Sequence, residues 1–165
     1  MFSFRCTKRL IKKLQASVVA DPPVPTNRLG DWYGNVLFSG HDRFMIFVSE
    51  RSLLPVVMPL RERKQLLPNF RSRLAELLFH LDVLEKDVGH ELSEMSEAVI
   101  ANTANPSLLA TMNYFIYDAK TYIEMHDDFS LLDLELWLAE TPCGPEPFRH
   151  PDKLAPQLLS GSDSR

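Results

Sequence analysis

Residues 35–58 read NVLFSGHDRFMIFVSERSLLPVVM, a pattern that predicts a three-stranded antiparallel meander. The expected strands cover residues 35–39, 43–49 and 53–58, with short polar turns between them. The middle strand is apolar on both faces, so we expect it to lie centrally in the sheet with cover on each side. Pro55 and Pro59 place the third strand at an edge or a bulge, because proline has no amide hydrogen for a neighbouring strand.

The chain before the meander predicts one more strand and one helix. Residues 2–6 alternate as a strand with one buried face would, and Thr7 can cap a short basic helix over residues 8–14. Three prolines within residues 21–27 favour an extended connector to the meander.

The second half of the chain has helical spacing. Apolar residues recur at helical steps over residues 70–81 and again over residues 84–99, where acidic side chains occupy the other faces. Asn105 followed by Pro106 is typical of a helix start, and the broad apolar face that follows predicts the central helix on the sheet. An S-x-x-D capping box predicts a last helix over residues 131–138.

Together these patterns predict an α+β fold. We expect an N-terminal strand and short basic helix, an antiparallel β-meander of three to four strands, and four to five helices packed on the sheet. The length of 165 residues fits a single domain, which we place at residues 1–140. Residues 141–165 hold five prolines and a Ser/Gly/Asp end, so we expect a mobile tail with a turn at residues 154–159.

The sequence argues against an integral membrane protein, because no apolar run approaches the roughly 20 residues of a membrane-spanning helix. Basic residues interrupt every N-terminal stretch that could serve as a signal peptide. Only Cys6 and Cys143 are present, too few for a disulfide framework or a metal site. We therefore expect a cytoplasmic protein with no metal and no cofactor.

Charge is divided unevenly along the chain, although the formal net charge is only -4. Residues 1–73 carry 13 Lys and Arg against 5 Asp and Glu, whereas residues 74–140 carry 2 against 14. The basic half is compatible with nucleic-acid binding, although no nucleic-acid motif accompanies it. The alternatives are attraction between the two halves and the docking of a protein partner. The sequence leaves the partner and the oligomeric state open.

The segment at residues 27–35, NRLGDWYGN, concentrates polar and aromatic side chains just before a strand. As a binding loop it offers the guanidinium of Arg28, which can hold an anion through two hydrogen bonds, and the rings of Trp32 and Tyr33 for stacking. The Asn35 amide and the Asp31 carboxylate add further polar groups. The structural alternative is a turn with glycines at positive φ, in which Asp31 is a cap and Trp32 belongs to the core.

The second candidate site is the helix start that carries Asn102, Asn105 and Asn113. Free amides at a helix N-terminus attract anions, and Asn113 lies about two turns further along. The alternative is simple capping by Asn105. No nucleotide-binding, hydrolase or zinc motif occurs in the chain, so catalytic residues stay unassigned and an enzyme is the less favoured class.

Three ordered blocks resemble a small bacterial family filed as a domain of unknown function. They are FRCTKRLIKKL at residues 4–14, RLGDWYGNVLF at 28–38 with ERSLLPVVMPL at 50–60, and ANTANPSLLATMNYF at 101–115. The likeness covers about residues 2–123 and implies no particular activity. In that family the last block continues from its Asn into an acidic residue, where this chain has Tyr114 after Asn113. The departure weakens any role for the two as a catalytic or metal-binding pair.

Two functional hypotheses follow. The first is a bacterial binding or regulatory module, linked to mobile elements or host defence, that uses residues 28–35 and 102–113. The second is an enzyme or binder that acts on nucleic acid or a phosphorylated small molecule, because of the basic N-terminal elements. The two polar regions make a credible site if they meet in space.

Overall fold

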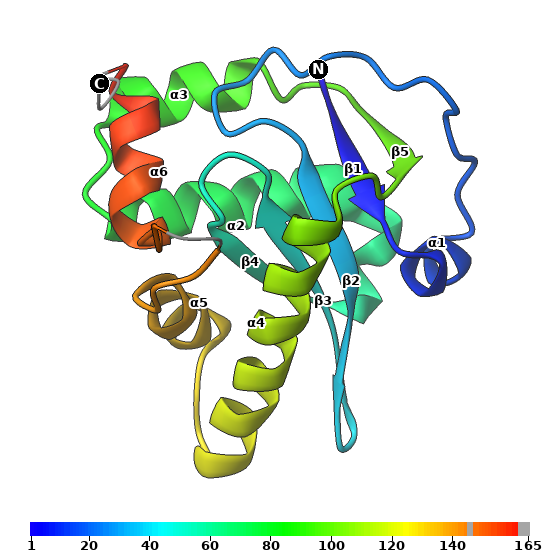
Figure 1. Ribbon diagram of the computed structural model, residues 1–165, viewed down its shortest axis with the longest axis vertical. Coiled ribbons are helices and arrows are strands. Elements are labelled where there is room, and N and C mark those ends of the chain that lie inside the picture. The colour runs from blue at the N-terminus through cyan, green and yellow to red at the C-terminus, as the bar shows by residue number, and fades with distance from the viewer. Residues whose placement is uncertain (145–146, 162–165) are drawn as a thin grey trace.

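A five-stranded sheet with helices on both faces forms the centre of the computed structural model, which describes residues 1–144 and 147–161 (Figure 1). The strands are β1 (Phe2–Cys6), β2 (Trp32–Ser39), β3 (Asp42–Ser49), β4 (Pro55–Pro59) and β5 (Ala98–Asn102). Their order is β4-β3-β2-β1-β5. β2, β3 and β4 are antiparallel, whereas β1 pairs in parallel with both β2 and β5. The predicted α+β class and meander are confirmed, with β4 at an edge.

The helices cover the two faces unequally. They are α1 (Lys8–Leu14), α2 (Leu66–His80), α3 (Glu85–Ser93), α4 (Pro106–Met125), α5 (Leu131–Ala139) and α6 (Pro151–Leu159), with a 3-10 helix η1 (Leu60–Gln65) after β4. α1, α2, α3 and α6 contribute buried side chains to the core on one face, and α4 to the core on the other. α5 contributes to both. None of the helices within the described ranges is long and apolar enough to cross a membrane.

Phe70 of α2 is the centre of the first core. Its ring centroid lies 5.1 Å from that of Phe4, 5.0 Å from that of Trp32 and 5.5 Å from that of Phe47. All three contacts are steeply inclined, which suits the charge distribution of aromatic rings and adds about 0.5–1.5 kcal/mol per pair to the gain from burial. The apolar residues of β1, β2 and β3 thus converge on α2.

The second core lies between the sheet and α4, the helix at the front of Figure 1. Leu108, Met112, Phe115 and Ala119 recur at helical steps and are buried against β2 and β3. The predicted start is confirmed, since Asn105 Oδ1 accepts the backbone N–H of Leu108 at 3.2 Å and Pro106 occupies the first turn. α4 is therefore the central helix, as the sequence predicts.

The predicted helix over residues 84–99 is wrong at its C-terminal end. α3 stops at Ser93, and Ala98–Asn102 form β5 instead. Val99 and Ile100 are β-branched and fit a strand, and the free edge of β1 supplies the backbone partners. Long-range pairing therefore overrides an apolar spacing that also fits a helix.

The packed structure also continues beyond residue 140. α6 buries Ala155 and Leu159 in the first core, so this part of the expected mobile tail is a docked helix. An apolar face at the steps of a helix explains the docking. Within the predicted tail, residues 145–146 and 162–165 lie outside the described residues.

Candidate functional site

β1 and β5 end side by side, and the helices that follow them lie on opposite faces of the sheet. Cys6 and Asn102 are partners in the parallel register. α1 packs on the first core through Leu10, whereas α4 packs on the second through Leu108. In open sheets, ligands bind where the chain diverges in this way. The same strand end brings together most of the polar residues predicted as a site.

Arg5 joins the two predicted polar regions. Its Nε donates to Asp31 Oδ2 at 3.0 Å, and its Nη1 donates to the backbone oxygen of Asn102 at 3.2 Å. The other carboxylate oxygen of the buried Asp31 accepts the backbone N–H of Ser3 at 2.8 Å. We call these contacts the Arg5 brace. Because the brace holds β2, β1 and the start of the α4 connection together, it fixes one end of α4.

Tyr33 and Asn35 lie on the α4 face of β2, beside the brace. Burial raises the pKa of the Tyr33 hydroxyl, while the Arg5 charge and a backbone hydrogen bond at Ala104 lower it. Asn35 Oδ1 accepts the hydroxyl hydrogen of Thr7 at 2.7 Å. The last contact fixes the N-cap of α1 against β2, so Asn35 has a structural partner within the fold.

Arg28 and Trp32 do not join this cluster. The guanidinium of Arg28 donates to the backbone oxygen of Leu159 in α6. Trp32 is 0% exposed and packs on Phe70, so it offers no surface for stacking with a ligand. The structural alternative is correct for Trp32, which belongs to the core, and for Gly30, which has a positive φ of 77°, but not for Gly34, which lies within β2 without one.

Glu91 explains why the loop before β2 is rigid. This α3 carboxylate is fully buried and accepts the backbone N–H groups of Arg28 at 2.7 Å and Leu29 at 3.0 Å, and the Asn27 side-chain amide at 3.2 Å. A buried carboxylate is tolerated when hydrogen bonds satisfy it in this way. We call this contact set the Glu91 latch. These hydrogen bonds hold the loop in its conformation, so no ligand is needed to explain that conformation.

At the start of α4, the three predicted asparagines have different surroundings. The Asn105 side chain caps the N-terminus of α4. Asn102 and Asn113 are exposed, and within residues 1–144 and 147–161 neither side chain has a hydrogen-bond partner. The polar regions thus meet through Arg5, but most of their side chains serve the fold.

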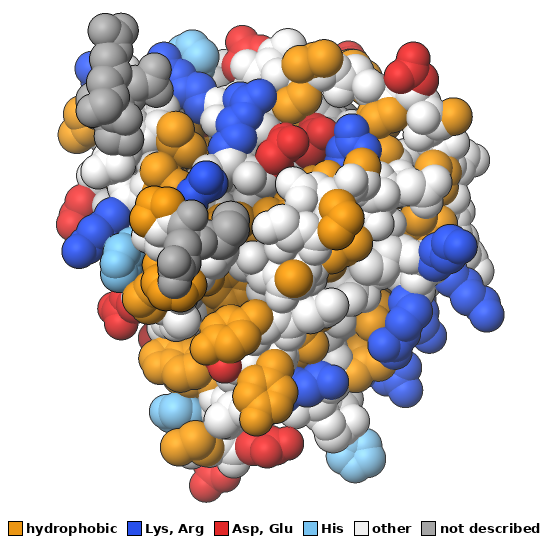
Figure 2. All heavy atoms as spheres, in the orientation of Figure 1, with side chains coloured by type: hydrophobic (Ala, Val, Ile, Leu, Met, Phe, Trp, Pro, Cys, Tyr) orange, Lys and Arg blue, Asp and Glu red, His pale blue; other side chains and the backbone are white. Residues whose placement is uncertain are grey.

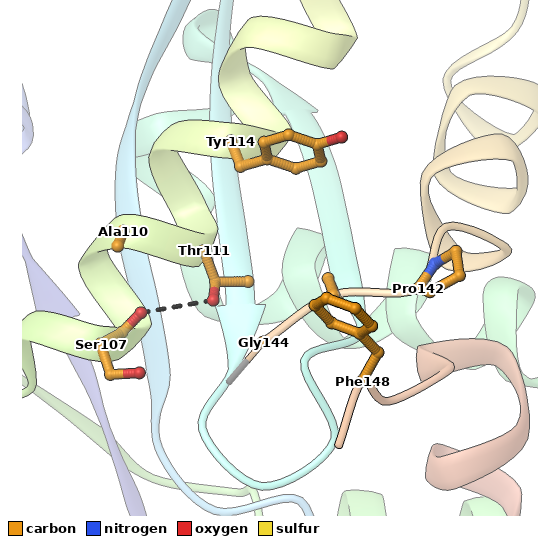
Figure 3. Close-up of a pocket in the computed structure, with 8 residues that line it drawn as sticks. Ser107, Ala110, Thr111, Tyr114, Pro142, Gly144 and Phe148 are labelled. Atoms are coloured by element: carbon orange, nitrogen blue, oxygen red, sulfur yellow. Dashed lines mark hydrogen bonds between the residues drawn. The ribbon is translucent and has the colours of Figure 1, made fainter. Parts of the chain in front are cut away.

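A cavity of about 540 Å³ lies beside the start of α4 (Figure 3). One wall is α4, through Ser107, Ala110, Thr111 and Tyr114, and the other is the segment after α5, through Pro142, Cys143, Gly144 and Phe148. The α4 residues follow one another at helical steps and form a single stripe, next to the stripe that faces the sheet. We call this space the α4 cavity.

The second wall of the α4 cavity is held in place by backbone hydrogen bonds. Cys143 and Arg149 exchange two of them, both at 2.9 Å, and so close the segment into a loop. Gly144 has a φ of +88°, and a Cβ there would lie 2.9 Å from the Leu53 side chain. Glycine adopts this left-handed conformation without the strain that a side chain would add, whereas the Leu53 side chain could move aside.

Two aromatic rings stand at the opening of the α4 cavity. Tyr114 is 52% exposed and Phe148 is 61% exposed. Figure 3 shows the two side chains extending from opposite walls toward the same space. Large rings exposed beside a cavity gain buried area when a ligand enters between them.

The α4 cavity has no charged side chain among its described lining residues. Burial raises the pKa of the Cys143 thiol to about 11, so this group is neutral at physiological pH. Thr111 donates its hydroxyl hydrogen to the Ser107 backbone oxygen at 3.3 Å, the contact dashed in Figure 3. The hydroxyls of Ser107 and Tyr114 remain as polar groups, and the lining suits an uncharged ligand.

The lining of the α4 cavity is what sequence reasoning missed. Its second wall lies in the region predicted as a mobile tail, and the closure of Cys143 on Arg149 leaves no local pattern. One signal was present, since Tyr114 and Tyr117 fall outside the apolar stripe that predicts the sheet-facing side of α4. Aromatic residues off the buried stripe of a helix are candidates for an exposed contact surface.

The chain also carries no sign of a metal centre in its described parts. No group of three or more His, Cys, Asp and Glu side chains there could hold a metal ion. The Arg5 brace supplies one buried carboxylate only, and its oxygens are already used by Arg5 and Ser3.

Residues 3–154 match the family described as "Domain of unknown function (DUF6933)", and the chain belongs to this family. The match spans the sheet from Ser3 of β1 onward, the Arg5 brace and both walls of the α4 cavity. No curated protein and no solved structure matches the chain. The family description names no activity.

Proposed function

We propose that the protein is a binding module that takes a small, uncharged ligand with an aromatic or aliphatic body into the α4 cavity. The observation that carries the proposal is the pair of half-exposed rings, Tyr114 and Phe148, at the mouth of a cavity whose described lining residues carry no charge. Ligand sites are concave, largely apolar and supplied with a few polar groups, and volumes of roughly 300–1,000 Å³ are typical. The α4 cavity, at about 540 Å³, falls in that range.

Hydrogen bonds that hold the described parts of both walls support the proposal. The α4 wall begins at the Asn105 cap and is tied to the sheet by the Arg5 brace. The opposite wall is closed by the backbone contacts between Cys143 and Arg149. A site whose walls are ordered before binding loses less conformational entropy when the ligand arrives.

The chemistry of the ligand follows from the lining. A carboxylate or ammonium group would find no counter-charge among the described lining residues when it leaves water, which is strongly unfavourable. A ring between Tyr114 and Phe148 would instead gain apolar contact on two sides. The Ser107 and Tyr114 hydroxyls can donate to one or two neutral acceptors on its rim.

The test is a titration with indole, with benzoate as its charged counterpart, followed by carbon-proton NMR of the methyl groups of Ala110 and Thr111. Indole is expected to move both signals saturably, and benzoate at equal concentration is not. The Ala110→Met variant fills the cavity and should abolish the shift of the Thr111 methyl signal, which it retains. Lys120→Met places the same side chain on an exposed part of α4 and should keep them.

Equal responses from the two methionine variants would contradict the proposal, because the shifts would then arise outside the α4 cavity. So would the absence of saturable shifts across a panel of uncharged aromatic fragments. A saturable response to benzoate alone would assign the cavity to anions and overturn the stated ligand class.

A further inference from the structure

The surface formed by α1, the β2–β3 hairpin and η1 collects positive charge from three separate elements. Its cations are Lys8, Arg9, Lys12, Lys13, Arg43, Arg61 and Arg63. All except the half-buried Arg63 are exposed. Figure 2 shows Lys and Arg side chains gathered along the edge of the molecule where α1 lies in Figure 1. We call this the basic track.

α1 carries its charge without compensation. The helix KRLIKKL has no acidic residue, and Lys8 and Lys12 as well as Arg9 and Lys13 are spaced at i, i+4. Like charges at this spacing repel each other and weaken a helix. Burial of Leu10 in the first core holds the helix in place in spite of this repulsion. An anionic partner would relieve the repulsion within this cluster.

Phe38 holds three of these cations together. The Arg9 guanidinium lies 5.7 Å, the Lys13 ammonium 6.0 Å and the Arg43 guanidinium 5.1 Å from the centroid of its ring. The face of an aromatic ring attracts cations, so one half-buried side chain orders charges from α1 and from β3. Among the described residues none of the three makes an ion pair.

The basic track continues beyond Phe38 to η1. A cavity of about 340 Å³ between the hairpin and η1 is lined by Arg43, Arg61 and Arg63, together with His41 and Asp42. Arg43 thus belongs both to the group around Phe38 and to this cavity. Glu62, the acidic residue within η1, is already paired with Arg73 through two hydrogen bonds. Asp42 adds one negative charge beside the three arginines, so positive charge stays in excess from α1 to η1.

We propose that the basic track binds the phosphodiester backbone of nucleic acid. Several mostly exposed cations in a row, without ion-pair partners among the described residues, are what neutralisation of successive phosphates requires. The net charge of the whole chain is -4, so general attraction by a basic protein does not explain such binding. The affinity would have to come from this surface.

A membrane surface fits the basic track less well. Helices that lie on membranes present large apolar side chains beside their cations. Leu10 of α1 is buried, and none of the exposed large apolar side chains in the described residues belongs to α1, the β2–β3 hairpin or η1. The surface can therefore attract anions but has nothing to insert among lipid chains.

The experiment measures fluorescence anisotropy of a labelled single strand of about 20 nucleotides, and of the matching duplex, over a salt series from about 50 to 300 mM. Affinity should fall steeply with salt, with a slope of about 0.7–0.9 per phosphate contacted. Lys8→Glu with Lys12→Glu should weaken binding at least tenfold and reduce the slope by about 2.

The matched control is Lys86→Glu with Lys120→Glu, which makes the same change in net charge on exposed positions of α3 and α4. It should change affinity less than twofold. A second variant pair, Arg9→Glu with Lys13→Glu, tests the group around Phe38, and circular dichroism confirms that each variant is folded.

Three results would overturn the inference. One is no salt-dependent binding to either nucleic acid, and another is equal weakening by the track and control pairs. The third is tighter binding to phosphatidylglycerol vesicles or to polyglutamate than to nucleic acid at equal charge concentration. Binding to vesicles or to polyglutamate would leave the proposal for the α4 cavity unaffected, because the indole titration tests that cavity separately.

Discussion

The buried carboxyl group of Glu135 in α5 accepts the backbone N–H of Val57 in β4 at 2.8 Å. β4 is an edge strand, and edge strands leave backbone groups without a strand partner. Glu135 satisfies one such group and closes this edge under α5. Burial raises the pKa of the Glu135 carboxyl to about 8, with the Val57 hydrogen bond and the Arg73 charge opposing the rise.

This raised pKa predicts that Glu135→Gln stabilises the protein above neutral pH. The folded protein holds the Glu135 proton up to about pH 8, whereas the unfolded chain releases it at the ordinary pKa of 4.5. Stability from this group is therefore complete at low pH and is lost as pH rises toward 8, by at most about 1.4 kcal/mol per pH unit. Urea unfolding at pH 5 and at pH 8 measures the difference between variant and parent.

Glu140→Gln is the control, because Glu140 is exposed at the end of the same helix. It should leave the pH dependence unchanged. A Glu135→Gln variant that shows the same difference from the parent at both pH values would show that Glu135 is ionised in the fold.

The Glu91 latch predicts a large effect from the loss of a single charge. Glu91→Gln replaces one accepting oxygen with an NH₂ group that faces backbone donors, so one buried N–H loses its partner. We expect the free energy of unfolding to fall by about 2–3 kcal/mol. Hydrogen exchange at Arg28 and Leu29 should accelerate more than elsewhere in the sheet.

Glu97→Gln makes the same chemical change at an exposed position just before β5. It should alter the free energy of unfolding by less than about 0.5 kcal/mol. If the two variants were equally stable, the latch would not hold the loop.

Two glycines should respond to alanine in opposite directions. A Cβ at Gly34 would lie 2.5 Å from the Phe47 ring and 2.9 Å from Leu10. Gly34→Ala is therefore expected to destabilise the protein by about 1–3 kcal/mol or more. Gly89 lies within α3 and a Cβ there meets nothing within 4 Å, so Gly89→Ala should stabilise it by about 0.5–1 kcal/mol. Thermal and urea unfolding of the two variants check the opposite signs, and a shift in the same direction for both would contradict the packing described.

The two thiols should react slowly and at different rates. Burial raises the pKa of Cys6 to about 12 and that of Cys143 to about 11. At pH 8 roughly one Cys143 thiol in 1,000 is ionised, so reaction with a disulfide reagent should be at least a hundredfold slower than for an exposed thiol. Cys143 should react before Cys6, and Phe148→Ala should accelerate Cys143 alone because it opens the α4 cavity. Mass spectrometry of partly labelled protein assigns the order, and labelling of Cys6 first would contradict it.

Elements with capped ends were predictable from the sequence. Thr7 accepts the Leu10 amide, and Ser130 and Asp133 form the predicted capping box, so α1 and α5 start where the sequence places them. Capping is decided within four residues, which a local pattern contains in full. The meander was predictable for the same reason, since its turns are short.

What depends on distant residues was not predictable. β5 needs the edge of β1, and the partners Phe2 and Ala98 are separated by most of the chain. The Arg5 brace likewise joins residues 97 positions apart. Local patterns therefore named Asp31, Tyr33 and Asn102 as candidates, but only the fold shows that Arg5 joins these regions and that Trp32 is buried.

The position of β1 between β2 and β5 has a consequence for biosynthesis. Its edge toward β5 stays unpaired until residues 98–102 have left the ribosome, long after the meander has been made. An unpaired strand edge is a template for other chains, so the nascent domain is most prone to self-association during this interval. Fragments that end before residue 98 should therefore aggregate, the more so because they also lack α4, which covers the second core.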